Sequence, residues 1–138
     1  MKIYFAGSIR GGRGDKELYY EFINHLAKYG QVLTEHIGDK NLTECGESVL
    51  SDENIYNRDM SWIEESDAVI AEVSTPSIGV GYEIGIAEGL NKNTLCLFRN
   101  QQDKKLSAMI SGNRKIKIAT YENVEDAISK IDNFFKSI

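Results

Sequence analysis

The chain has 138 residues, a length typical of one domain, and its 41% hydrophobic and 27% charged residues are usual for a globular protein. Its formal net charge of −5 argues against a general nucleic-acid-binding surface. No apolar run approaches the ~20 residues of a membrane helix. Because the sequence starts directly with a strand-like segment, we expect no signal peptide. We therefore expect a single cytoplasmic domain over residues 1–138 that binds neither nucleic acid nor membrane.

The first apolar run, residues 2–7, predicts a strand that leads into the glycine-rich stretch GSIRGGRG. This stretch lacks the GxGxxG pattern and the GKS or GKT ending of the common phosphate loops. Ser8, Arg10 and Arg13 nevertheless lie among glycines that let backbone amides approach a ligand closely. An anion site is the functional interpretation, and a turn with solvated arginines is the alternative.

A helical pattern over residues 15–29 follows, with Gly30 as its expected C-terminal stop and a second strand over residues 31–35. The irregular stretch over residues 36–48 is a candidate flap over a site. Ser51 is the expected N-cap of a second helix.

The remaining elements continue the alternation of strand and helix. Strands are expected over residues 68–73, 94–98 and 115–121, and helices in residues 79–90, near residues 106–110, and over an apolar stripe from Val124 to Phe135. The pattern predicts an α/β fold, a flavodoxin-like or Rossmann-like three-layer sandwich with a five-stranded parallel sheet. In such sheets, ligands bind beyond the carboxyl ends of the strands where the strand order reverses. That position falls between GSIRGGRG and STPSIGVGYE.

Two carboxylates are candidates for chemistry in this crevice. Glu83 lies in the expected first turn of the third helix and shares an inward stripe with Val80 and Ala87. Asp59 lies on the apolar face of the second helix, where an acid is costly unless it is paired or functional. Helix capping by Glu83 and an arginine partner for Asp59 are the structural alternatives. Two inward acids beside an anion site favour glycosidic chemistry.

The tyrosine of the first strand, the cysteines and the histidines bear on the kind of site that the chain can form. Tyr4 is either a core aromatic or a partner of Glu83, because a buried hydroxyl needs a hydrogen bond. The two cysteines, Cys45 and Cys96, show no metal-binding spacing, and the two histidines are isolated. We expect a reduced protein without a metal or cofactor.

The segments YFAGSIRGGR, YGQVLTEH, DAVIAEVSTPSIGVGYEIG and LCLFR, followed by LSAMI, closely resemble the 2'-deoxynucleoside 5'-phosphate N-hydrolases of the nucleoside 2-deoxyribosyltransferase superfamily. The resemblance runs in order from Tyr4 to about Ile110. It implies cleavage of the N-glycosidic bond of a 2'-deoxynucleoside 5'-monophosphate, which gives 2-deoxyribose 5-phosphate and the free base.

The resemblance also implies roles for individual residues. Glu83 matches the nucleophile that forms a covalent intermediate, Asp59 the acid that assists base departure, and Tyr4 a tyrosine that positions nucleophile and sugar. The implied substrate-binding positions are Ser8, Ile9, Arg10, Gly11, His36, Ser77, Gly79 and Ser107. Ser77 and Gly79 match phosphate ligands, and Ser107 matches a serine that the partner subunit of a homodimer supplies.

This assignment makes physical demands on the two acids. A retaining mechanism needs carboxylates about 5 Å apart. We expect the helix dipole to keep Glu83 ionised and apolar neighbours to keep Asp59 protonated.

Three other functions stay open. They are a deoxyribosyltransferase that passes the sugar to a second base, a ribonucleotide N-hydrolase of the CMP type, and a non-catalytic nucleotide sensor. The anion site and Ser107 favour a phosphorylated substrate over the unphosphorylated nucleosides of the transferases, and the two inward acids argue against a sensor.

Overall fold

The computed structural model describes residues 1–9, 15–34, 37 and 50–138. Five strands form one sheet in the order β2-β1-β3-β4-β5, and every neighbouring pair is parallel. The strands are β1 (Lys2–Ala6), β2 (Gln31–Val32), β3 (Ala68–Glu72), β4 (Asn93–Arg99) and β5 (Lys117–Tyr121). This topology confirms the expected flavodoxin-like α/β fold and places the reversal of strand order between β1 and β3.

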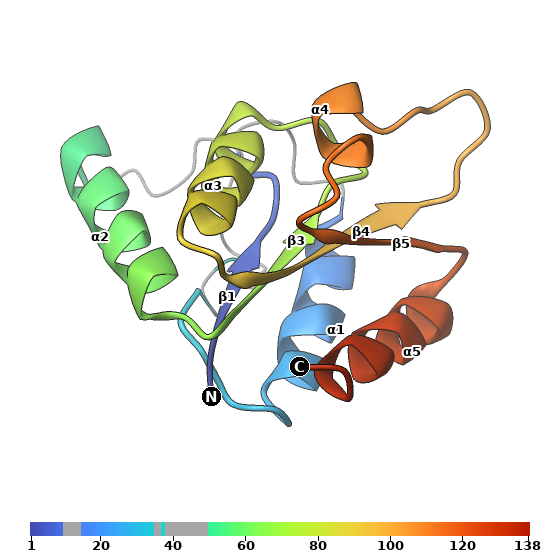
Figure 1. Ribbon diagram of the computed structural model, residues 1–138, viewed down its shortest axis with the longest axis horizontal. Coiled ribbons are helices and arrows are strands. Elements are labelled where there is room, and N and C mark those ends of the chain that lie inside the picture. Colours follow the sequence, from blue (N-terminus) through green and yellow to red (C-terminus); the bar gives the residue numbers. More distant parts are fainter. Residues whose placement is uncertain (10–14, 35–36, 38–49) are drawn as a thin grey trace.

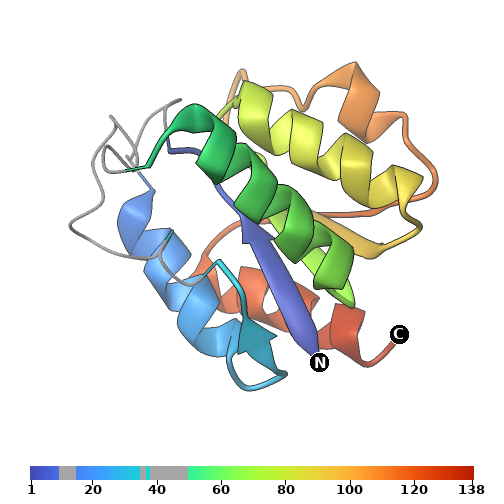
Figure 2. The same cartoon turned by 90° about the vertical axis from the view of Figure 1, so that its left-hand side faces the viewer.

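Helices cover both faces of the sheet (Figures 1 and 2). They are α1 (Lys16–Leu26), α2 (Asp52–Glu65), α3 (Ile78–Gly89), α4 (Ala108–Ser111) and α5 (Val124–Phe135). Successive side chains of a strand point to opposite faces. Ile3 and Phe5 therefore join a core cluster with α1 and α5, whereas Tyr4 and Ala6 join a second cluster with α2 and α3. Burial of these two apolar layers is the main force that holds the sandwich together.

Local sequence signals account for most helix boundaries. Ser51 and Ser77 cap α2 and α3, each accepting a hydrogen bond from a backbone N–H three residues later. Asn123 caps α5 in the same way. The apolar stripe predicted for the last helix is confirmed, since Ala127 and Ile131 are fully buried.

The second strand is shorter than predicted. Strand β2 ends at Val32, although the Leu33 N–H still bonds the Ile3 carbonyl at 2.9 Å. Beyond Leu33, the Thr34 side chain pairs with β1. Thr34 Oγ1 accepts from the Phe5 N–H at 2.8 Å and donates to the Phe5 carbonyl at 2.7 Å. A buried threonine hydroxyl thus replaces two backbone ladder groups.

The predicted role of Gly30 as the stop of the first helix is wrong. Helix α1 ends at Leu26, four residues earlier. A Cβ atom at position 30 would lie 2.1 Å from the Met1 carbonyl oxygen. Glycine is needed there because the chain passes against the backbone at the start of β1, where the Gln31 N–H bonds Met1 O at 2.9 Å.

Candidate active site

Tyr4 and Glu83 form a pair between the sheet and α3. The Tyr4 hydroxyl donates to Glu83 Oε1 at 2.7 Å, and Tyr4 is completely buried. Burial and the neighbouring carboxylates of Glu83 and Asp59 raise the pKa of Tyr4, which keeps its proton on the hydroxyl. Both sequence interpretations of Tyr4 therefore hold, because it is a core residue and also the hydrogen-bond partner of Glu83.

Glu83 faces inward as predicted, but it is not in the first turn of its helix. Helix α3 begins at Ile78, and its first turn contains no acidic residue. Val80 and Ala87 on the same stripe are buried, and Glu83 is partly buried. The expected support from the helix dipole is weak at this position, because the effect fades beyond the first turn.

The surroundings of Glu83 set its protonation near neutrality. Burial raises its pKa to about 7, with a smaller upward contribution from the negative charge of Asp59. The hydrogen bond from Tyr4 opposes this rise, since it stabilises the carboxylate. At pH 7 the side chain thus exists in both forms, and the ionised fraction grows with pH.

Asp59 is paired with an arginine, which is the arrangement expected as the alternative to a catalytic role. The Arg58 side chain donates to Asp59 Oδ1 from Nε at 2.9 Å and from Nη2 at 2.8 Å, and 19% of the Asp59 side chain is exposed. The guanidinium carbon of Arg58 also lies 4.6 Å from the centre of the Trp62 ring. An ion pair favours the charged carboxylate and so acts against the predicted protonation of Asp59, which stays a prediction. Arg58 was missed at the sequence level, although it directly precedes Asp59 and lies four residues before Trp62.

A cavity of about 790 Å³ lies beside the N-terminus of α3 and reaches α4. Ser77 and Ser107 both line it, but Tyr4, Glu83 and Asp59 do not. Ser107 precedes α4 and makes no side-chain capping bond. At Gly79, an added Cβ would touch Ser77 Oγ at 3.8 Å and no other atom of the described residues, so these residues leave the surface beside the helix start open.

The loop after β1 contributes a buried serine. Ser8 is fully buried, its N–H bonds the Tyr19 hydroxyl at 3.2 Å, and its Oγ has no hydrogen-bond partner in the part of the chain that the structure describes. Ile9 packs against the core cluster on the side of α1. Arg10, Gly11 and His36 lie outside the described residues, as do Arg13, Cys45 and the candidate flap apart from Ile37.

Two negative findings concern the described residues alone. Within residues 1–9, 15–34, 37 and 50–138, no group of three or more His, Cys, Asp or Glu side chains is arranged to hold a metal ion. No helix in these ranges is long and apolar enough to cross a membrane.

Cys96 is buried in β4, and burial raises the pKa of its thiol to about 12, as fits a structural residue.

Comparison with known proteins places this geometry in a family. The family model described as nucleoside 2-deoxyribosyltransferase matches residues 3–128. The 5-hydroxymethyl-dUMP N-hydrolase of Esox lucius is 53% identical over 114 residues, 81% of this chain and 79% of that protein. The protein of the same name from Danio rerio is 44% identical over 140 residues, 100% and 98% of the two chains. The protein of the same name from Homo sapiens is 42% identical over 139 residues, which cover 98% of this chain and 79% of that protein.

Solved structures share the fold at low sequence identity. The solution structure of BlsM is 21% identical with a TM-score of 0.78, over 99% of this chain and 90% of that one. The CMP N-glycosidase BcmB of Clostridium botulinum is 20% identical with a TM-score of 0.71, and the match covers 96% of this chain and 99% of that one. The family match spans nearly the whole chain and agrees with the resemblance seen in its motifs. The chain belongs to the nucleoside 2-deoxyribosyltransferase family.

Proposed function

We propose that the protein hydrolyses the N-glycosidic bond of 2'-deoxynucleoside 5'-monophosphates and releases 2-deoxyribose 5-phosphate and the free base. The observation that carries this proposal is the buried Tyr4 hydroxyl 2.7 Å from Glu83, with the Asp59 carboxylate close enough to raise the pKa of Glu83. Mere binding does not require two acids and a tyrosine in one cluster. Relatives up to 53% identical are named as N-hydrolases of 5-hydroxymethyl-dUMP, which is a substrate of this class.

Glu83 acts as the nucleophile in this proposal. Its ionised oxygen attacks the anomeric carbon, the bond from that carbon to the base nitrogen breaks, and a covalent deoxyribosyl ester forms. Asp59 gives a proton to the departing base and recovers one from the water that resolves the ester. Because the ion pair with Arg58 favours the ionised form of Asp59, the proposed mechanism requires Asp59 to gain a proton before the base departs.

The 5'-phosphate binds at the start of α3. Ser77 and Gly79 lie at the N-terminus of a 12-residue helix, where free N–H groups and the helix dipole favour anions. Ser8 Oγ, which has no hydrogen-bond partner among the described residues, supplies a further donor from the loop after β1. Arg10 and Gly11 follow Ser8 in the sequence. Binding energy from the phosphate then orients the sugar for attack.

The active unit is a homodimer in which Ser107 reaches the neighbouring site. Ile78 and Met109, beside the cavity of Ser77 and Ser107, are 95% and 83% exposed. Helix α3 also presents glycines at 81, 85 and 89, where an added Cβ would meet no atom of the described part of the chain within 4 Å. Exposed glycines weaken an isolated helix, whereas a packed partner benefits from the close approach they permit. Ser107 lines the same cavity as Ser77 of its own chain, and Glu83 does not line it.

Transfer of the sugar to a second base is the alternative that the description of the matching family favours. The test is incubation with 5-hydroxymethyl-dUMP, dGMP, dCMP, CMP and deoxyguanosine, with and without an acceptor base, while free base and new nucleotides are followed by chromatography. Release from the deoxynucleoside monophosphates supports the proposal. Release from deoxyguanosine but not dGMP contradicts the phosphate requirement, and a new nucleotide in the presence of acceptor favours transfer.

A further inference from the structure

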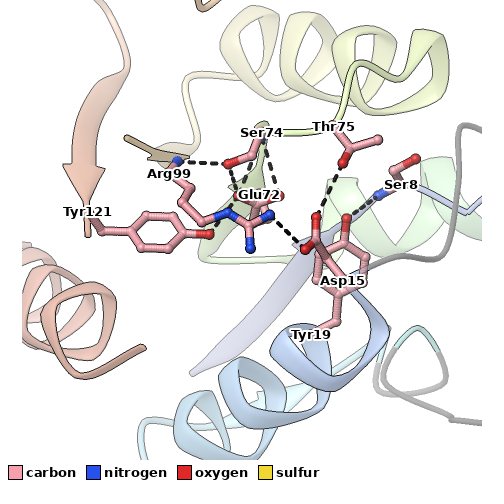
Figure 3. A network of polar contacts seen from close by, with 8 residues as sticks. All are labelled: Ser8, Asp15, Tyr19, Glu72, Ser74, Thr75, Arg99 and Tyr121. Atoms are coloured by element: carbon pink, nitrogen blue, oxygen red, sulfur yellow. Dashed lines mark hydrogen bonds and ion pairs between the residues drawn. The ribbon is translucent and has the colours of Figure 1, made fainter. Parts of the chain in front are cut away.

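A polar cluster at the carboxyl edge of the sheet has no part in the proposed chemistry. Its members come from the start of α1, the ends of β3, β4 and β5, and the loop between β3 and α3 (Figure 3). We call it the edge network, and it consists of Asp15, Glu72, Ser74, Thr75, Arg99 and Tyr121. It lies among the loops that carry the proposed phosphate ligands.

Asp15 occupies the N-cap position of α1 without capping it. An aspartate at this position ordinarily accepts a hydrogen bond from the first turn of its helix. Asp15 makes no such bond, and its two oxygens instead bind two other segments. Arg99 Nη2 donates to Oδ1 at 2.6 Å, and Thr75 Oγ1 donates to Oδ2 at 3.2 Å. Only 13% of the Asp15 side chain is exposed, so these bonds are shielded from water.

Arg99, at the end of β4, connects Asp15 to the loop after β3. Its backbone N–H donates to Ser74 Oγ at 2.7 Å, while its guanidinium extends to Asp15. The Arg99 Nε atom is buried and has no hydrogen-bond partner among the residues that the structure describes. The bond to Asp15 is therefore a principal tether of the guanidinium.

Glu72 fixes the other end of the network. It is fully buried at the end of β3, where Ser74 donates to it from Oγ and from the backbone N–H, and Tyr121 donates from its hydroxyl at 2.9 Å. Ser74 is thus held between Glu72 and Arg99, and its place in the loop is set from two strands.

The two loops that this network joins are those that carry the proposed phosphate ligands. Asp15 closes the loop that begins with Ser8, and Thr75 lies two residues before Ser77. Ser74, Thr75 and Ser77 line the same cavity. A shift of either loop would move one group of phosphate donors relative to the other.

We propose that Asp15 is a positioning residue, which clamps the loop after β3 to the start of α1 through its bonds to Thr75 and Arg99. The clamp keeps the proposed phosphate ligands of the two loops in fixed positions relative to one another. This inference rests on the proposed function. It assigns to Asp15 no contact with the reacting atoms.

The experiment compares Asp15→Asn with Asp132→Asn. Asp132 is a matched control, because it also accepts two side-chain hydrogen bonds, from Tyr29 at 2.6 Å and His25 at 2.5 Å, and it joins α1 to α5 away from the carboxyl edge. For each protein, kcat and KM are measured with a 2'-deoxynucleoside 5'-monophosphate and with the corresponding nucleoside. Binding of 2-deoxyribose 5-phosphate is measured by calorimetry, which needs no turnover.

Asp15→Asn is expected to raise KM for the nucleotide and Kd for 2-deoxyribose 5-phosphate about tenfold, with a much smaller effect on the nucleoside. Thr75→Val is expected to act in the same direction, and the double variant to lose less than the product of the two single effects. Asp132→Asn is expected to match the wild type on both substrates.

An Asp15→Asn protein with unchanged KM and Kd overturns the clamp, as does an equal loss on nucleotide and nucleoside, since general loosening has no preference for the phosphate. The wild type separates this result from failure of the proposed function. If the wild type binds 2-deoxyribose 5-phosphate but releases no base, the proposed reaction is contradicted, and the clamp is tested by comparing Kd for 2-deoxyribose 5-phosphate between wild type and Asp15→Asn. If the wild type neither binds 2-deoxyribose 5-phosphate nor releases base, both the proposed reaction and the clamp are contradicted.

Discussion

Replacement of Tyr4 by phenylalanine isolates the effect of one hydroxyl on Glu83. Tyr4 is fully buried among apolar neighbours, so phenylalanine fits the same space and removes the donor 2.7 Å from Glu83 Oε1. That bond lowers the pKa of Glu83 against the upward effect of burial, which together set it at about 7. Without it, the pKa of Glu83 rises further.

The size of the effect follows from the strength of a hydrogen bond to a charged group. Such bonds contribute about 1.5–3 kcal/mol, and about 1.4 kcal/mol corresponds to one pH unit. The acidic limb of kcat/KM, governed by ionisation of Glu83 in the free enzyme, is therefore expected to move up by about one to two pH units. Relative to the wild type, activity at pH 7 falls roughly 5- to 50-fold, and this difference between the two proteins largely disappears by pH 9.

The assay is the pH profile of kcat/KM between pH 5 and pH 9.5 for wild type and Tyr4→Phe with the same deoxynucleotide. The substrate phosphate also titrates near pH 6, but its contribution is common to both profiles and cancels in their ratio. Tyr29→Phe is the control, because it removes a hydroxyl bonded to Asp132, outside the site. An equal loss at every pH, or an unmoved acidic limb, would refute the reasoning.

Three further predictions concern the acids and the interface. The pKa of Glu83 is raised from 4.5 to about 7 in the folded state, so the free energy of unfolding of the wild type falls as pH rises through this interval. Glu83→Gln is therefore expected to be more stable than the wild type by about 1–3 kcal/mol at pH 8. Below pH 4.5 it is expected to show no such gain. Urea unfolding at both pH values measures this, and equal stability at pH 8 contradicts it. Asp59→Asn is expected to slow release of poor leaving bases far more than of good ones, and a uniform loss across a series of bases argues against proton donation by Asp59. Gly85→Arg is expected to give folded monomers in sedimentation, because none of the residues that the structure describes lies within 4 Å of the new Cβ. Ser129→Arg, on the exposed surface of α5, is expected to stay dimeric. A dimeric Gly85→Arg protein would place the interface elsewhere.

The architecture was predictable because each of its signals is local. Alternating strand and helix patterns and the cap at Ser51 predict the elements, and the position of the ligand site follows from general rules for parallel sheets. The inward direction of Glu83 also followed from helical periodicity. The need of a buried hydroxyl for a hydrogen bond makes Tyr4 a candidate partner of Glu83.

The interactions that the sequence does not reveal are those made between distant elements. The approach of Gly30 to Met1 and the exchange of ladder bonds by Thr34 depend on the packing of β1 against the following segment. The edge network joins residues as far apart as Asp15 and Arg99, and no periodicity links them. Arg58 is different, because it is adjacent to Asp59, yet adjacent helix residues ordinarily point away from each other.

The claim that Glu83 carries the reaction is tested most directly by the products that wild type and Glu83→Gln form from one 2'-deoxynucleoside 5'-monophosphate. Free base and 2-deoxyribose 5-phosphate are quantified together, and calorimetry confirms that the variant still binds the nucleotide. The account predicts equal amounts of the two products from the wild type and neither product from Glu83→Gln. Base release by a nucleotide-bound Glu83→Gln protein at the wild-type rate would contradict it.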